Sequence, residues 1–238
     1  MRRVVVVTAL VGLVTLLATV PPASGAPDRA RAAQEARVDF NDDGFADLAV
    51  GAPLEDVGGA TDAGALNVLY GSASGLEPSP DVFFQGSGGV SGALEDDDRF
   101  GSAVAEGDFN GDGIFDLAVG APGETVGSAV AAGAVNVLVG SSGGLTGGPL
   151  FTQGNPEAGD QFGAALAAGD FDDDGVFDLA VGAPGETVGA AAFAGAVSVF
   201  TGSGGPGGTV TPGPVFTQGP GSLGGAAETN DNLGAALE

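Results

Sequence analysis

The sequence predicts an all-β fold made of β-propeller blades, each a sheet of four antiparallel strands. Three observations predict it. The heptapeptide Asp-Leu-Ala-Val-Gly-Ala-Pro occurs at 47–53, 116–122 and 178–184, a nine-residue aspartate-rich loop leads into each copy, and each unit holds four short apolar runs. Short runs bounded by Gly, Pro, Ser or Asp are typical of strands, and four such strands per repeat form one propeller blade. We therefore expect three blades and the start of a fourth, which is a partial propeller.

The N-terminus has the pattern of a secretory signal peptide over residues 1–26. Arg2 and Arg3 precede an apolar run from Val4 to Val20, and a small-residue cleavage site ends at Ala26. This run has 17 residues, fewer than the ~20 that a membrane-spanning helix needs, so an uncleaved membrane anchor is the weaker alternative. We expect cleavage after Ala26, no membrane insertion after cleavage, and a chain that is secreted or extracellular at the cell surface. Residues 27–37 form an N-terminal linker.

The repeat places the blades at about 38–86, 98–154 and 160–219, with the start of the next at 231–238. Successive heptapeptides are 69 and 62 residues apart. These spacings exclude WD-type blades of about 40 to 45 residues, kelch blades of about 50 and β-helix repeats of about nine. In the second unit we expect strands at 100–105, 117–120, 134–139 and 149–153.

The chain is strongly acidic, with 31 Asp and Glu residues against 6 Lys and Arg and a formal net charge of −25. From residue 38 onward Arg99 is the only basic residue. Such a field repels phosphate backbones and anionic headgroups, so nucleic acid and bilayer surfaces are poor partners and cations are favoured. The absence of His and Cys excludes Ser-His and Cys-His nucleophiles as well as disulfides.

The aspartate-rich loops share the pattern Asp-x-Asx-x-Asp-Gly-x-x-Asp at 39–47, 108–116 and 170–178. Oxygen ligands at positions 1, 3 and 5 let a tight loop surround one hard cation, and the Gly at position 6 permits the sharp turn. The carbonyl at position 7 and the carboxylate at position 9 bring the shell toward the about 6 to 8 oxygens that calcium prefers. The sequence therefore predicts about three calcium sites. Their ligands are Asp39, Asn41, Asp43, Phe45 and Asp47; Asp108, Asn110, Asp112, Ile114 and Asp116; and Asp170, Asp172, Asp174, Val176 and Asp178.

Other metals and other loop types fit less well. Magnesium usually keeps several waters, and zinc prefers His or Cys ligands. An EF-hand needs Glu at position 12, where this chain has Val50, Val119 and Val181. A metal-free acidic turn stays open as the alternative for any single loop, because Asp, Asn and Gly favour turns without a metal.

Residues 40–238 resemble the FG-GAP repeat family, which includes the propeller of integrin α subunits. Phe100-Gly101 and Phe162-Gly163 match the first half of the motif, and Gly51-Ala-Pro53 and its two equivalents match the second. The resemblance implies calcium bound in the aspartate loops on one face and ligand recognition on the opposite face. The first unit departs from the family, since Arg31-Ala32 replace Phe-Gly and Val38 replaces a Gly. With no fourth loop before Glu238, the chain looks like a truncated, bacterial-type secreted member.

The expected function is an integrin-like adhesion or interaction module that binds an unidentified extracellular protein or polysaccharide and is not an enzyme. Its partner face would be formed by the loops 54–63, 123–132 and 185–194, unless these loops only cover the rim. Open blade edges would also allow self-association.

The alternative function is a non-catalytic accessory domain of a secreted hydrolase. Paired carboxylates could hydrolyse glycosides, but Glu124 and Glu186, the recurring ones outside the loops, lie in a repeated Gly-Glu-Thr-Val-Gly, which favours a structural role. Only 12 of the 29 acids after residue 37 lie in the loops, so adaptation to salt stays open as a reason for the remaining acidity.

Overall fold

The computed structural model describes residues 38–204, 209–219 and 222–237. The predicted signal peptide, the linker and the substituted Phe-Gly position at 31–32 lie outside these residues. Over the described part of the chain, no helix is long and apolar enough to cross a membrane.

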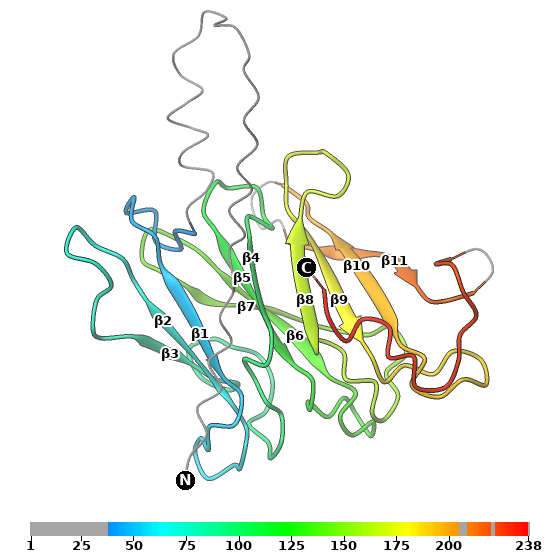
Figure 1. The fold of residues 1–238 in the computed structure, drawn as a ribbon. Helices are drawn as coiled ribbons and strands as arrows, with labels where there is room; N and C mark the ends of the chain where they lie inside the picture. Colours follow the sequence, from blue (N-terminus) through cyan, green and yellow to red (C-terminus); the bar gives the residue numbers. More distant parts are fainter. Residues whose placement is uncertain (1–37, 205–208, 220–221, 238) are drawn as a thin grey trace, which may run out of the picture.

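The described residues form three antiparallel sheets of three, four and four strands, which confirms the predicted all-β class and agrees with partial propeller blades. Each sheet is a simple meander in which neighbours along the chain are neighbours in the sheet, and the sheets lie side by side in chain order (Figure 1). The first contains β1 (Leu48–Ala52), β2 (Ala65–Leu69) and β3 (Asp81–Phe83); the second β4 (Val104–Gly107), β5 (Asp116–Ala121), β6 (Ala134–Val139) and β7 (Thr146–Thr152); the third β8 (Ala165–Gly169), β9 (Asp178–Ala183), β10 (Ala196–Thr201) and β11 (Thr211–Phe216).

The strand expected at 100–105 begins four residues later, with β4. Phe100 and Gly101 instead form a turn, in which Arg99 and Gly101 have φ values of 57° and 88°. Phe100 pairs with Gly64 of the first sheet in an isolated parallel bridge. The turn therefore belongs to the contact between two sheets, and an apolar run alone does not distinguish such a contact from a strand. The strand expected at 149–153 likewise lies slightly earlier, as β7.

The last strand of each sheet, which is β3, β7 or β11, lies at a sheet edge and has features that disfavour pairing with a further strand. β3 has only three residues, and β11 contains Pro212 and Pro214. Proline on an edge strand removes a donor and blunts the edge against pairing with another chain. Both β7 and β11 pair irregularly with their inner neighbours, because the register shifts once in each.

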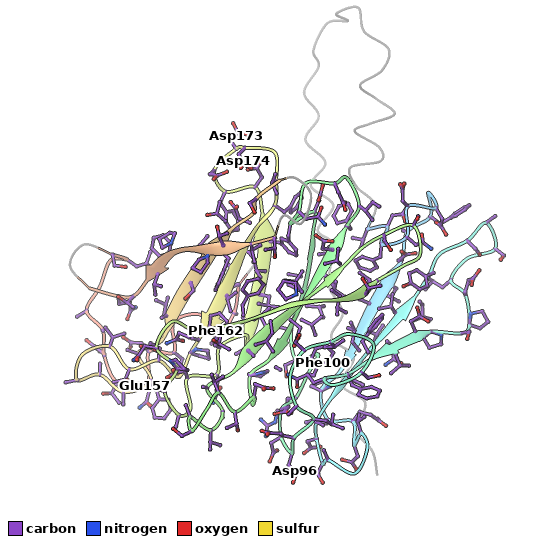
Figure 2. The ribbon with its side chains drawn as sticks, turned by 180° about the vertical axis from the view of Figure 1, so that it is seen from behind. Asp96, Phe100, Glu157, Phe162, Asp173 and Asp174 are labelled. Carbon is purple, nitrogen blue, oxygen red and sulfur yellow. The ribbon has the colours of Figure 1, made fainter. Side chains whose placement is uncertain are left out.

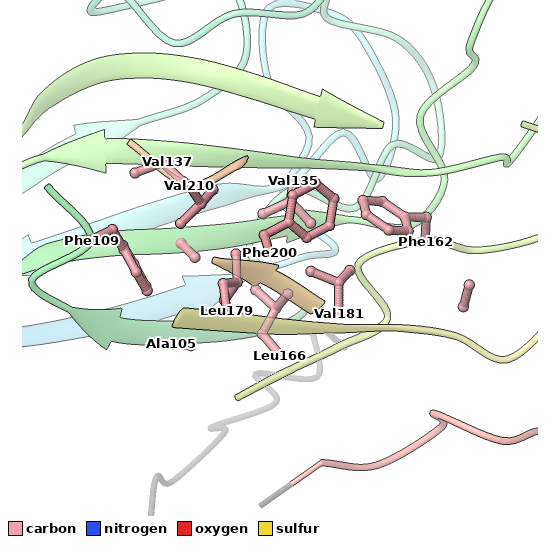
Figure 3. Packing of buried hydrophobic residues seen from close by; sticks show 12 residues of the cluster. Ala105, Phe109, Val135, Val137, Phe162, Leu166, Leu179, Val181, Phe200 and Val210 are labelled. Atoms are coloured by element: carbon pink, nitrogen blue, oxygen red, sulfur yellow. The ribbon is translucent and has the colours of Figure 1, made fainter. Parts of the chain in front are cut away.

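The apolar cores lie between the sheets. Alternate residues of β5 face opposite ways, so Leu117 and Val119 belong to the core shared with the first sheet and Ala118 to the core shared with the third. Figure 3 shows the core between the second and third sheets, where Phe162 and Phe200 stand edge to face with ring centroids 5.9 Å apart. Because β5 is buried over its whole length, the second sheet is held on both faces.

A pair of glycines sets how closely neighbouring sheets approach. A Cβ atom on Gly51 would lie 2.0 Å from the carbonyl oxygen of Gly101, and one on Gly120 would lie 2.0 Å from that of Gly163. Gly182 meets Gly234 in the same way, and Leu233 makes the corresponding bridge to Gly195. The Phe-Gly or Leu-Gly turn after each sheet therefore covers the Gly-Ala-Pro segment of the sheet before it.

Candidate metal centre

Each aspartate loop leads directly into a strand of its unit, which is β1 at the edge of the first sheet and the inner strands β5 and β9 of the other two. Two residues per loop have left-handed backbone conformations, at positions 4 and 6. Position 6 is the predicted glycine, with φ near 90° in each loop. Position 4 is Asp42, Gly111 or Asp173, with φ of 55°, 70° and 61°. Asp and Gly are among the residues that adopt this conformation, so the loop turns twice where the sequence predicted one sharp turn.

The aspartate at position 1 accepts hydrogen bonds from the backbone N–H groups of positions 5 and 6. In the first loop Asp39 accepts hydrogen bonds from the N–H groups of Asp43 and Gly44, at 3.2 and 2.8 Å. Asp108 and Asp170 make the same pair of bonds, at 3.1 and 2.8 Å and at 3.0 and 2.9 Å. The backbone of positions 5 and 6 is thus drawn over this carboxylate.

The aspartate at position 5 accepts a hydrogen bond from the N–H of position 7. The donors are Phe45, Ile114 and Val176, at 2.9, 2.9 and 2.8 Å. The residue whose carbonyl was predicted as a ligand is therefore held against a predicted carboxylate ligand through its own N–H.

The third loop brings three carboxylates together. One carboxylate oxygen each of Asp170, Asp172 and Asp174 lies within 4.8 Å of the others, and all three side chains are exposed. Partial desolvation in the loop, with repulsion from Asp174, Asp178 and Asp170, raises the pKa of the Asp172 carboxyl. Crowded carboxylates without a base nearby repel one another, and a bound divalent cation would relieve that repulsion.

The first two loops have asparagine at position 3, whose amide oxygen is also a hard ligand. The Asn41 Nδ2 donates to Asp43 at 3.1 Å, and the Asn110 Nδ2 donates to Asp116 at 3.3 Å. Each asparagine oxygen accepts the N–H of position 5, at 3.1 and 2.9 Å. The three loops therefore share the backbone hydrogen bonds to positions 1 and 5, and the third loop has the most acidic residues.

The aspartate at position 9 is buried and ties its loop to the sheet. Asp116 accepts the N–H of Phe109 at 3.2 Å and the N–H of Gly140, which follows β6, at 2.9 Å. Asp47 and Asp178 make equivalent bonds. Burial raises the pKa of Asp116 to about 7, and repulsion from Asp112 and Asp108 adds to the rise, although both backbone donors oppose it. Both carboxylate oxygens of Asp116 already accept backbone hydrogen bonds, so its main role is to hold the loop on the sheet.

The loops of neighbouring units are also joined. The carbonyl of Asp39 accepts the N–H of Phe115 at 3.4 Å, and the carbonyl of Asp108 accepts that of Phe177 at 3.0 Å. The aromatic side chain at position 2 packs into the next sheet, since Phe40 and Phe109 are buried within the two cores. The backbone thus couples the loops from unit to unit.

The loops that were expected to form a partner face lie at the other end of the sheets. β1 starts at its aspartate loop and ends beside residues 54–63, and β5 and β9 are arranged in the same way. Figure 2 places Asp173 and Asp174 at the opposite end from Asp96 and Glu157. Leu54, Val130 and Phe193 are exposed on the partner-face loops.

One recurring group was missed from the sequence. Asp98 and Asp160 are buried in the segments between sheets, and each accepts the N–H of the Glu three residues earlier, at 2.7 and 2.6 Å. Asp231 does the same at 2.7 Å. The signal that could have found this turn is Glu-x-x-Asp, which precedes the Phe-Gly or Leu-Gly pair at 95–98, 157–160 and 228–231.

Comparison with known proteins agrees with the repeat. A model of the FG-GAP repeat matches residues 33–69, 100–143 and 162–200. A phosphatidylinositol-glycan-specific phospholipase D of Rattus norvegicus is 39% identical over 150 residues, which cover 63% of this chain and 18% of that protein. Integrin alpha-PS5 of Drosophila melanogaster is 36% identical over 155 residues, 62% of this chain and 14% of the integrin. Integrin alpha-10 of Homo sapiens is 39% identical over 115 residues, 48% and 9%. The chain thus spans less than a fifth of the length of these relatives.

Proposed function

Because the chain belongs to the FG-GAP repeat family, we propose that it is a calcium-binding interaction module that acts outside the cytoplasm and has no catalytic activity of its own. Three features support the three parts of this proposal. They are the oxygen-rich loops, the predicted signal peptide and the use of the recurring carboxylates in structural contacts.

The observation that carries the calcium proposal is the carboxylate group Asp170, Asp172 and Asp174. It offers only oxygen ligands, on a loop whose backbone already holds two of the three side chains in place. Calcium accepts such flexible oxygen sets. The same backbone bonds recur in the other two loops, so we propose three sites with the ligands predicted from the sequence. Bound calcium would supply the positive charge that the loops lack and would hold neighbouring units together.

The proposed partner is an extracellular protein or polysaccharide that contacts the loops 54–63, 123–132 and 185–194. Two observations support this face. It exposes Val130 and Phe193, at 65% and 47%. Ala131 and Phe193 also have φ values of 54°, a strained conformation for residues other than Gly, Asn or Asp that often marks a functional site. An integrin-like adhesion role rests on this face.

A second candidate is a non-catalytic accessory domain of a secreted hydrolase. The likeness to the phospholipase D, of which this chain spans 18%, favours it. In this role the module would still bind calcium and would still lack turnover.

The test of the calcium proposal is a calorimetric titration, with thermal unfolding followed in parallel. We expect about three calcium ions per chain and a stabilisation of about 2.7 kcal/mol per site at a hundredfold excess over Kd. Asp170→Asn should remove one site, because Asp170 both organises the loop and supplies a ligand. Asp173→Asn is the matched control, since it removes the same charge from position 4, where the second loop has glycine.

Three results would overturn the proposal. They are the absence of calcium heat and stabilisation, an equal response to magnesium at the same ionic strength, or equal losses in Asp170→Asn and Asp173→Asn. A panel of polysaccharide and phosphodiester substrates tests the absence of catalysis, and turnover that disappears in Glu124→Gln would contradict it.

A further inference from the structure

Each junction between neighbouring sheets brings together a Gln, a Glu and an Asp from three separate segments. At the first junction Gln85 follows β3, Asp98 lies between the sheets and Glu124 follows β5. Gln85 donates its Nε2–H to the Glu124 Oε2 at 2.5 Å. The N–H of Gly123 donates to the Asp98 carbonyl at 3.1 Å, which holds the backbone next to Glu124 against Asp98. None of these residues belongs to the candidate metal centre.

The first junction is sealed from solvent. Gln85, Asp98 and Glu124 are 1%, 0% and 8% exposed. Asp98 accepts the N–H of Glu95 through its Oδ2, but its Oδ1 and the Oε1 of Gln85 are buried without a hydrogen-bond partner among the described residues. The junction therefore contains more acceptors than donors, and a buried acceptor left without a donor is costly.

Among the residues that the structure describes, no base compensates the two buried carboxyls. The negative charge of Glu95 raises the pKa of both carboxyls, and the charges of Asp96 and Asp97 raise that of Asp98. Arg99 pairs with Asp97 at 3.2 Å, in a contact where both side chains are more than half exposed. Burial, with repulsion from Asp98 and Glu95, raises the pKa of Glu124 to about 7. Burial also raises the pKa of Asp98 to about 6, with repulsion from Glu95, Asp96 and Asp97.

A proton fits this site better than a metal ion. Calcium needs about 6 to 8 oxygens, some of which are usually water, and three nearly inaccessible side chains leave little access for water. Two carboxyl groups buried at the same junction favour the uptake of one proton instead, because a like charge and burial both disfavour a second ionised group. An O–H group would also supply the missing donor.

We propose that Glu124 stays protonated in the folded chain at mildly acidic pH and donates its O–H to Asp98, which closes the junction between the first two sheets as a proton-dependent latch. On ionisation the proton leaves to solvent, the donor is lost, and two negative charges remain buried between the sheets. The first junction then loosens. This inference is independent of calcium binding.

The direction of the pH effect follows from the raised pKa of Glu124. Below its ordinary value of 4.5 the group is protonated in both folded and unfolded chains, and the latch contributes fully. Between that value and about 7 the folded chain binds more protons than the unfolded chain, so stability falls as pH rises. Above this window the contribution is lost.

The second junction provides an internal comparison. Gln153 donates to Glu186 in the same arrangement, and Asp160 is buried there. Glu186 and Gln153 are only half-buried, so water can solvate the ionised carboxylate. We expect the second junction to respond to pH less than the first.

The test measures hydrogen exchange of single amides between pH 5.5 and 8 in EDTA, corrected for intrinsic exchange. The N–H groups of Gly123 and Phe100 bridge the first junction, and those of Gly185 and Phe162 bridge the second. In the unaltered chain the protection of Gly123 and Phe100 should fall by tenfold or more as pH rises. Glu124 limits this change to about thirtyfold, because only the pH units between 5.5 and its folded pKa of about 7 contribute, each by at most about tenfold.

Glu124→Gln is the decisive variant, because its amide places a permanent N–H donor where the proton would be. We expect it to remove most of the pH dependence at Gly123 and Phe100, because only the raised pKa of Asp98 remains, and to raise their protection at pH 8. Asp98→Asn, which also removes one of the two charges, is the second variant. Glu77→Gln, at an exposed position, is the control that should change nothing.

Two results would refute the latch. One is a pH response that persists in both Glu124→Gln and Asp98→Asn. The other is a response of equal size at the first and second junctions, because that would report a general acidic destabilisation.

Discussion

Phe109 and Phe171 occupy the same position in successive aspartate loops but differ in what covers them. Each donates its backbone N–H to the aspartate at position 9, at 3.2 and 2.8 Å. The Phe109 side chain is 0% exposed in the core between the second and third sheets, whereas Phe171 is 54% exposed. Replacing each by alanine therefore compares the stability lost with a ring buried between sheets and the stability lost with an exposed ring at the same position of the loop.

The expected costs differ by several kcal/mol. Replacing a fully buried Phe by Ala costs about 3 to 5 kcal/mol, from lost transfer energy and the cavity left behind. An exposed substitution is usually within about 0.5 kcal/mol. A chain of this size shifts its Tm by about 2 to 4 °C for each kcal/mol, so Phe109→Ala should lower Tm by roughly 6 °C or more. Phe171→Ala should leave it nearly unchanged.

Thermal and urea unfolding in EDTA provide the assay, because removing metal leaves packing as the difference between the two variants. The Phe40→Ala variant adds a third point, since Phe40 is 1% exposed and should behave like Phe109→Ala. If Phe171→Ala cost as much as Phe109→Ala, the aromatic ring would be stabilising its own loop, and the argument from contact between sheets would be wrong.

Two further substitutions test the contacts between sheets. Gly120→Ala should destabilise the chain by about 3 kcal/mol or more, because overpacking of this severity cannot be relieved by a rotamer change. Urea unfolding measures the loss, with Gly154→Ala as the control because nothing lies within 4 Å of its added Cβ. Equal stability of the two variants would contradict the close approach of the sheets. Tyr70→Phe should cost about 1 to 2 kcal/mol, because the Tyr70 hydroxyl accepts the N–H of buried Leu145 at 3.0 Å; an unchanged unfolding midpoint would show that water replaces the hydroxyl.

The parts of this structure that depend on nearby residues could be predicted from the sequence. The aspartate loops are nine residues long, and their internal bonds join residues no more than seven apart. The pattern of Asp, Asx and Gly therefore contains most of the information that shapes them. The strands β5 and β6 fall within one residue of the predicted ranges for the same reason, since short apolar runs between Gly and Asp define them.

Contacts between distant segments could not be predicted in this way. Gln85 and Glu124 lie 39 residues apart, and nothing in either local sequence indicates that they meet. Phe100-Gly101 was expected to start a strand because it opens an apolar run, but its conformation is decided by Gly64 of the preceding sheet. The role of Asp116 is similar, because its bond to Gly140 crosses 24 residues and makes it a structural anchor as well as a predicted ligand.

The turn that follows each sheet shows that the sequence repeat and the folded unit are out of phase. A sheet is completed on its Gly-Ala-Pro side by the Phe-Gly or Leu-Gly pair at the start of the next repeat, as Gly51 is by Gly101 and Gly182 by Gly234. A cut immediately after an outer strand would therefore leave the preceding sheet unfinished. The natural place to divide or join such modules lies several residues inside the next repeat, just after its glycine.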